Sequence, residues 1–111
     1  MIRFLAILAV VWVGCSRHEA PADAVQRYFK AMAAGDCATV KPLLADEHAS
    51  CDKMLEDYKE NGVVFQGIQK VEHDGRDTKV TLVSVGVHYK NADHVWIVRV
   101  EDHDGLPRLR F

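Results

Sequence analysis

The chain after residue 20 first carries apolar residues at helical spacing. Pro21 suits the first turn of a helix because its missing N–H is not needed there, and Gly35 is a natural C-terminal stop. The pattern therefore predicts a helix between these two residues. Its apolar stripe follows i, i+3, i+4 spacing through Val25, Tyr28, Phe29, Met32 and Ala33.

Two further helical segments are expected before residue 62. The segment 36–45 is a short helical piece, in which Pro42 prevents a long regular helix. Ser50 is a suitable N-cap for a third helix, and Asn61-Gly62 ends it.

After Gly62 the apolar period changes from 3.6 to 2, which indicates strands. Gly67 is an expected bulge in the first strand, and Pro107 indicates that the last strand is an edge. The expected strands are 63–72, 79–90, 95–102 and 106–111, joined by turns at 73–76, 91–93 and 104–105. This order predicts an α+β fold, with N-terminal helices packed on a curved four-stranded antiparallel meander.

Length and charge exclude several classes of protein. The 111 residues fit one domain, and 27% charged with 49% hydrophobic residues fits neither a disordered chain nor a polytopic membrane protein. The net charge of −2 argues against a general nucleic-acid binder. No phosphate-cradling glycine loop or dinucleotide fingerprint is present, and no cofactor is expected.

The first 14 residues have the pattern of a targeting segment. Arg3 precedes an unbroken apolar run at 4–13, whose ten residues reach about 15 Å as a helix, half of a ~30 Å hydrocarbon core. The run is therefore too short to span a membrane and has the length of a signal-peptide core.

Val13-Gly14-Cys15 after this run resembles a bacterial lipobox. The resemblance implies a signal peptide at 1–14, acylation of Cys15, a short tether through residue 20 and one domain at 21–111. Three acyl chains hold stably to a bilayer, so it also implies a permanent anchor in the cell envelope, facing the periplasm. Lipoproteins of this kind that stay in the inner membrane usually carry Asp at the position after the acylated cysteine. This chain has Ser16 there, which favours the outer membrane. The mature chain would have 97 residues and a net charge of −3.

Acylation of Cys15 leaves two cysteines, Cys37 and Cys51. An exported compartment is oxidising, so we expect a disulfide between them; two free buried thiols are the alternative. The chain has no CxxC pair, which argues against a cysteine zinc site.

Three passages of the chain resemble the nuclear transport factor 2-like and cystatin-like superfamily. They are YFKAMAAGD at 28–36, VKPLLADE at 40–47 and WIVRVEDHDGLPRLRF at 96–111. In that family the ligand lies between the helices and the concave sheet face, on a scaffold shared by isomerases, dehydratases, ligand binders and interaction modules. Residues that would line such a pocket are Tyr28, Phe29, Tyr58, Phe65, Tyr89 and Trp96; ordinary core packing is the alternative role for them.

Two His-Asp-Gly turns are the weak candidates for a metal site. In a four-stranded meander the first and third turns lie at the same end of the sheet, roughly 10 Å apart. Imidazole and carboxylate suit zinc, copper or nickel, although Asp-Gly is also simply good turn chemistry. The residues concerned are His73, Asp74, His103 and Asp104.

The sequence offers no plainly interior Asp or Glu on its strands, which argues against an isomerase-type enzyme. We therefore expect a lipid-anchored, non-enzymatic module that binds a protein or a small molecule at the cell envelope. A small isomerase or dehydratase and a structural envelope lipoprotein are the alternatives.

Overall fold

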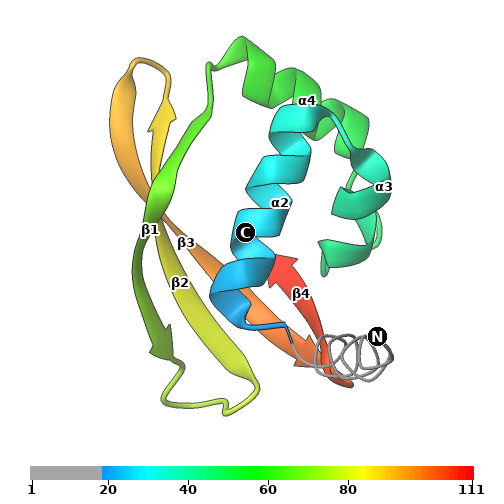
Figure 1. The fold of residues 1–111 in the computed structure, drawn as a ribbon, viewed down its shortest axis with the longest axis vertical. Coiled ribbons are helices and arrows are strands. Elements are labelled where there is room, and N and C mark those ends of the chain that lie inside the picture. Colours follow the sequence, from blue (N-terminus) through cyan, green and yellow to red (C-terminus); the bar gives the residue numbers. More distant parts are fainter. Residues whose placement is uncertain (1–18) are drawn as a thin grey trace, which may run out of the picture.

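The computed structural model describes residues 19–111 as helices followed by one antiparallel sheet (Figure 1). The leader and Cys15 lie outside the described residues. The helices are α2 (Pro21–Ala34), α3 (Cys37–Val40) with the 3-10 turn η1 (Lys41–Leu43), and α4 (Cys51–Glu60). The strands are β1 (Val64–His73), β2 (Val80–Tyr89), β3 (Ala92–His103) and β4 (Leu106–Arg110). The α+β class, with helices ahead of strands, is confirmed.

Helix α2 begins and ends as the sequence predicts. Pro21 occupies its first turn, and Gly35 takes the left-handed conformation with φ 69° while its N–H caps the carbonyl of Met32. The buried face differs from the predicted stripe in three positions, because Ala33 is exposed whereas Ala24 and Ala31 are buried. The apolar stripe is therefore centred nearer the start of the helix than the spacing indicated.

The segment after α2 divides into two short pieces around a proline. The Asp36 carboxylate caps α3 by accepting hydrogen bonds from the Thr39 N–H at 3.2 Å and the Thr39 hydroxyl at 2.6 Å. These bonds lower the pKa of Asp36, the bond from the hydroxyl most of all. Pro42 stands in η1, where the chain leaves α-helical geometry.

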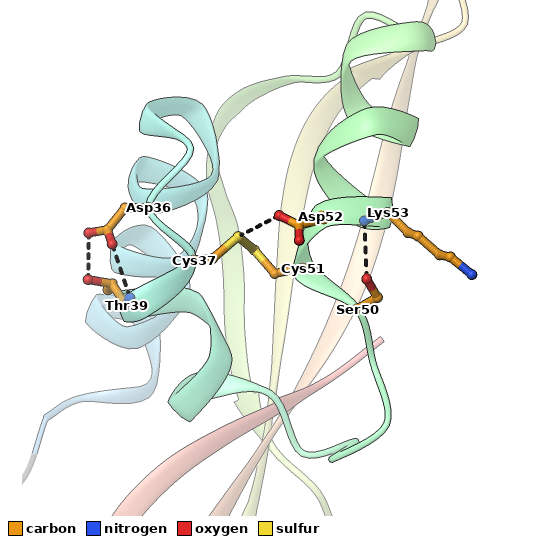
Figure 2. Close-up of a disulfide and its surroundings, with 7 residues drawn as sticks. All are labelled: Asp36, Cys37, Thr39, Ser50, Cys51, Asp52 and Lys53. Atoms are coloured by element: carbon orange, nitrogen blue, oxygen red, sulfur yellow. Dashed lines mark hydrogen bonds between the residues drawn. A yellow bond between two sulfur atoms is a disulfide. The ribbon is translucent and has the colours of Figure 1, made fainter.

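Ser50 caps α4 through a hydrogen bond to its side chain from the Lys53 N–H at 3.3 Å, as predicted. Cys37 and Cys51 form a disulfide with their Cα atoms 5.8 Å apart, so the expected bridge is confirmed (Figure 2). It joins the first residues of α3 and α4. The bridge therefore ties α4 to the preceding helical segment near its N-terminal end.

The sheet has the order β1-β2-β3-β4, with consecutive strands antiparallel. Gly67 has φ 118° and lies at a register shift between β1 and β2, so the expected bulge is confirmed. Asp104-Gly105 is the predicted tight turn, because His103 pairs with Leu106.

The turn between β2 and β3 is tighter than predicted. Ala92 already pairs with Tyr89, and Asp93 pairs with His88, so the turn consists of Lys90 and Asn91 alone. Both turn residues have positive φ, 50° and 65°, which is the geometry of a two-residue hairpin loop. Asn tolerates that conformation, whereas Lys90 gives no such signal in the sequence.

One face of the sheet meets α2 and carries the core (Figure 1). Fully buried valines on β2 and β3 pack against Val25, Tyr28 and Phe29 of α2. The buried sheet residues in this core are Val83, Val85, Val87, Val98, Val100 and Leu109.

Loss of the disulfide is expected to lower stability. The cysteines are 14 residues apart, and closing a loop of that size stabilises by about 3 kcal/mol in the chain-entropy model. We therefore expect the paired substitution of Cys37→Ser with Cys51→Ser to lower the free energy of unfolding by about that amount. Urea unfolding of both proteins measures it, with the reduced parent as control. A variant as stable as the oxidised parent would contradict the expectation.

Candidate functional site

The six aromatic residues predicted to line a pocket lie in one connected cluster. Phe65 stacks on Phe29 with ring centroids 4.6 Å apart, and Phe29 meets Tyr28 edge-on at 4.9 Å. On the other side, Trp96 lies 6.1 Å from Tyr58 and 5.6 Å from Tyr89. The structure therefore brings all six together between the helices and the sheet.

Tyr28 and Tyr58 link the two halves of this cluster. Their hydroxyl oxygens are 2.7 Å apart, and Tyr28 is fully buried. Burial raises the pKa of both phenols, so both remain protonated at neutral pH. The pair is therefore a hydrogen-bonded connection between α2 and α4, not a source of a base.

Phe111 belongs to the same cluster, and the sequence analysis missed it. Its ring lies 4.9 Å from Tyr28 and 6.5 Å from Phe29. The sequence placed it on the last strand without a face, and its position follows only from the path of the chain past β4. An aromatic residue two positions after the buried Leu109 was the available signal.

An open groove of about 920 Å³ runs between α2, α4 and the start of β1. We call it the α2–α4 groove; Phe29, Leu55, Tyr58 and Phe65 form its apolar floor. Lys30 and Lys59 supply its charged side chains. Part of the predicted aromatic set thus lines a real depression and is not confined to the core.

A second groove of about 620 Å³ lies at β3. We call it the β3-edge groove. Its lining is apolar apart from the Tyr58 hydroxyl and backbone groups, and Tyr58 contributes to both grooves. The lining residues are Met54, Tyr58, Val95, Trp96, Ile97 and Phe111.

The four residues that were weak candidates for a metal site do not form a cluster in the described structure. Asp74 accepts a hydrogen bond from Arg99 at 3.3 Å, and the His103 ring nitrogen lies 3.0 Å from Glu101. Asp104 is in the tight turn, and His73 ends β1. Within residues 19–111, no three His, Cys, Asp or Glu side chains are arranged to hold a metal ion.

Glu101 is the centre of a charge network on the outer face of the sheet. It accepts hydrogen bonds from Arg110 at 2.9 Å and lies beside His103. Arg110, more than any other group, lowers the pKa of Glu101. The Glu101 side chain is 16% exposed. Because Glu101 lies on β3 and Arg110 on β4, the network links these two strands.

Comparison of the chain with known protein families, with curated proteins and with solved structures gives no significant match. In the part of the chain that the structure describes, no helix has both the length and the apolar character needed to cross a membrane.

Removing either tyrosine hydroxyl is expected to destabilise the fold, because the remaining hydroxyl loses its hydrogen-bond partner, and that of Tyr28 is fully buried. We expect Tyr28→Phe and Tyr58→Phe each to cost about 1–2 kcal/mol, and the double variant to cost less than their sum. Urea unfolding in a double-mutant cycle measures the coupling. Tyr89→Phe is the control, because the structure shows no hydrogen bond to the Tyr89 hydroxyl from residues 19–111. Strict additivity would show that the hydroxyls do not interact.

Glu101→Gln is expected to lower the free energy of unfolding by about 1 kcal/mol at pH 7. Because the folded pKa of Glu101 is lowered, this contribution is present above the unfolded pKa of about 4.3 and is lost as the pH falls through the folded value. The difference from the parent should therefore be smaller at about pH 3 than at pH 7, because pH 3 lies below the unfolded pKa. Denaturant unfolding at both pH values tests this. Glu72→Gln is the control, since Glu72 has one exposed partner, Lys70, at 3.5 Å. An effect equal at both pH values would contradict it.

Proposed function

We propose that this chain is an exported, lipid-anchored module of the cell envelope that binds a protein or a small molecule and catalyses no reaction. The observation that carries the proposal is the Cys37–Cys51 disulfide together with the lipobox-like Gly14-Cys15. A disulfide is compatible with an extracytoplasmic location, where such bonds persist. The two features are independent, and both agree with export.

The aromatic cluster supports binding more than catalysis. The space between the helices and the sheet is filled by packed rings. The α2–α4 groove has an apolar floor beside Lys30 and Lys59, and the β3-edge groove is apolar. Among residues 19–111, Thr81 is the one residue with a polar or charged side chain that is buried as a whole. The arrangement offers shape and apolar surface to a partner, which is the chemistry of a binding module.

The position of the domain's start supports a definite orientation. Glu19 and Pro21 lie beside Lys79, Asp102 and Gly105, so the tether joins at the end of the sheet that holds the β3–β4 turn. The α2–α4 groove includes Val64, which pairs with His88 near the opposite end. If Cys15 is acylated, this short tether directs the grooves away from the bilayer. We also propose membership of the nuclear transport factor 2-like group, which the order of helices and strands supports.

The test is the chemical state of residue 15 in the full-length protein expressed in a bacterium. We expect mass spectrometry to find the chain starting at Cys15 with acyl groups, and fractionation to find it in membranes. Cys15→Ala should remove both the acyl mass and membrane retention, because the anchor is the acylated thiol. Ser16→Ala is the matched control and should remain acylated. An intact Met1, or a bare Cys15 thiol on soluble protein, would refute the proposal.

A further inference from the structure

Half of strand β3 has no strand partner on one side. The short strand β4 pairs with Arg99–His103 of β3, from Arg99↔Arg110 to His103↔Leu106. The preceding part of β3, residues 92–98, pairs with β2 on one side and with no strand of residues 19–111 on the other. We call this stretch the open β3 edge.

The register shows which backbone groups this edge presents. Tyr89 and Ala92 flank a two-residue turn and so form a hydrogen-bonded pair, and the pattern alternates from there. Ala92, His94, Trp96 and Val98 therefore direct their peptide groups to β2. Asp93, Val95 and Ile97 direct theirs to the open edge. The Asp102 N–H donates to the Lys79 carbonyl at 2.9 Å, so this even-numbered residue also faces the β2 side, as the alternation requires.

The outer edges of β1 and β4 carry features that discourage the addition of another strand, whereas the open β3 edge does not. β1 has two register shifts and carries Lys70 and Glu72, devices that discourage strand pairing. The outer side of β4 is met by the chain at Leu44 and by an Ala45 N–H that donates to Leu109 at 2.8 Å. The register of β3 with β2, in contrast, is uninterrupted from Ala92 to Glu101.

Both faces beside the open β3 edge are apolar. Val95 and Ile97 are 56% and 60% exposed, and they lie on the outer face with Ser84 and Gly86 opposite them. On the inner face the β3-edge groove offers Met54, Trp96 and Phe111. An added strand would therefore find apolar contacts for alternate side chains on both of its faces.

The charges at the rim indicate the chemistry of the occupant. Asp93 points to the outer face at one end of the edge, and its carboxylate is 73% exposed. Hydrogen bonds from His88 of β2 and Gln66 of β1 lower the pKa of Asp93, so it is ionised at neutral pH. The carboxylate therefore leans over β2, and a long basic side chain on an added strand is needed to reach it. Asp57 on α4 is exposed and lies one helical turn from Met54 of the groove. No basic side chain lines the groove within the described residues.

We propose that the open β3 edge binds an extended segment of a partner protein by strand addition, with apolar side chains at successive positions and a basic residue opposite Asp93. This inference rests on the proposed function and names the partner of the module. A second copy is a poorer occupant, because antiparallel pairing of two β3 strands sends the two Pro21 ends in opposite directions. Two short tethers then could not reach one bilayer with the sheets upright.

The experiment uses the full-length protein in detergent, with residue 15 checked by mass spectrometry in the same sample. The probe is the capped peptide Thr-Ile-Leu-Val-Leu-Lys-Thr, whose Lys falls opposite Asp93 when the peptide runs antiparallel to β3. We expect binding to protect the Val95 and Ile97 amides from hydrogen exchange. Replacing the peptide Lys by Glu should weaken binding by about threefold at low salt. N-methylation of the peptide Val, whose N–H faces β3, should abolish binding, whereas N-methylation of the next Leu should not.

Two variants at one position separate the backbone from the side chain. Val95→Pro removes the N–H that faces the open edge and leaves the ladder with β2 intact, so it should weaken binding about tenfold or more. Val95→Thr keeps that N–H and should weaken binding about threefold at most. Equal effects, or binding of the N-methylated Val peptide, would overturn the proposal. So would a dimer in sedimentation that Val95→Pro dissolves. An acylated protein that binds no peptide would refute strand addition and leave the anchored module standing.

Discussion

The packing of α2 on the inner face of the sheet is the interaction on which the rest of this structure depends. Tyr28 and Phe29 point from one side of that helix into the valines of β2 and β3, and Tyr28 is fully buried. Burial of a large aromatic side chain contributes about 1.5–3 kcal/mol, so these two residues carry much of the stability of a domain this small. Because α2 occupies the face, the α2–α4 groove runs along the side of this helix, and the β3-edge groove is formed by α4, β3 and Phe111.

The disulfide supplies what apolar packing alone would not. Cys51 is the buried residue of α4, whereas Met54, Leu55 and Tyr58 are only partly buried, so α4 has a small share of the core. A helix with so little buried surface is marginal by itself. The covalent bond to Cys37 and the hydrogen bond between the Tyr58 and Tyr28 hydroxyls hold it in place. As a result, one flank of α4 lines the α2–α4 groove and another lines the β3-edge groove.

Local signals predicted the local structure well. Pro21, Gly35, Ser50 and the Asp104-Gly105 turn each act through neighbouring backbone, so their effects can be read from a few residues. The Lys90-Asn91 turn was misplaced because a lysine with positive φ gives no signal in the sequence. The six aromatic residues could be predicted as a set because they share the apolar faces of their elements.

The open β3 edge could not be predicted, because it depends on the difference in length between β3 and β4. β3 extends from Ala92 to His103, whereas β4 ends at Arg110, opposite Arg99. The predicted β3 began at Val95, and that shorter strand would have left less of an edge. Register and strand length are set by the whole sheet, so the consequence is visible only in three dimensions.

An unprotected strand edge is a liability for a protein that diffuses freely, since identical edges can pair. Anchoring changes that balance. Under the proposed anchoring, a domain held at its Pro21 end would meet other copies in parallel orientation, whereas the pairing of two β3 strands considered above is antiparallel. The proposed anchor would also confine the domain to a surface and raise its effective concentration toward a partner held there. A short stretch of backbone and a shallow apolar groove can then suffice for binding, although neither would hold a partner tightly in solution.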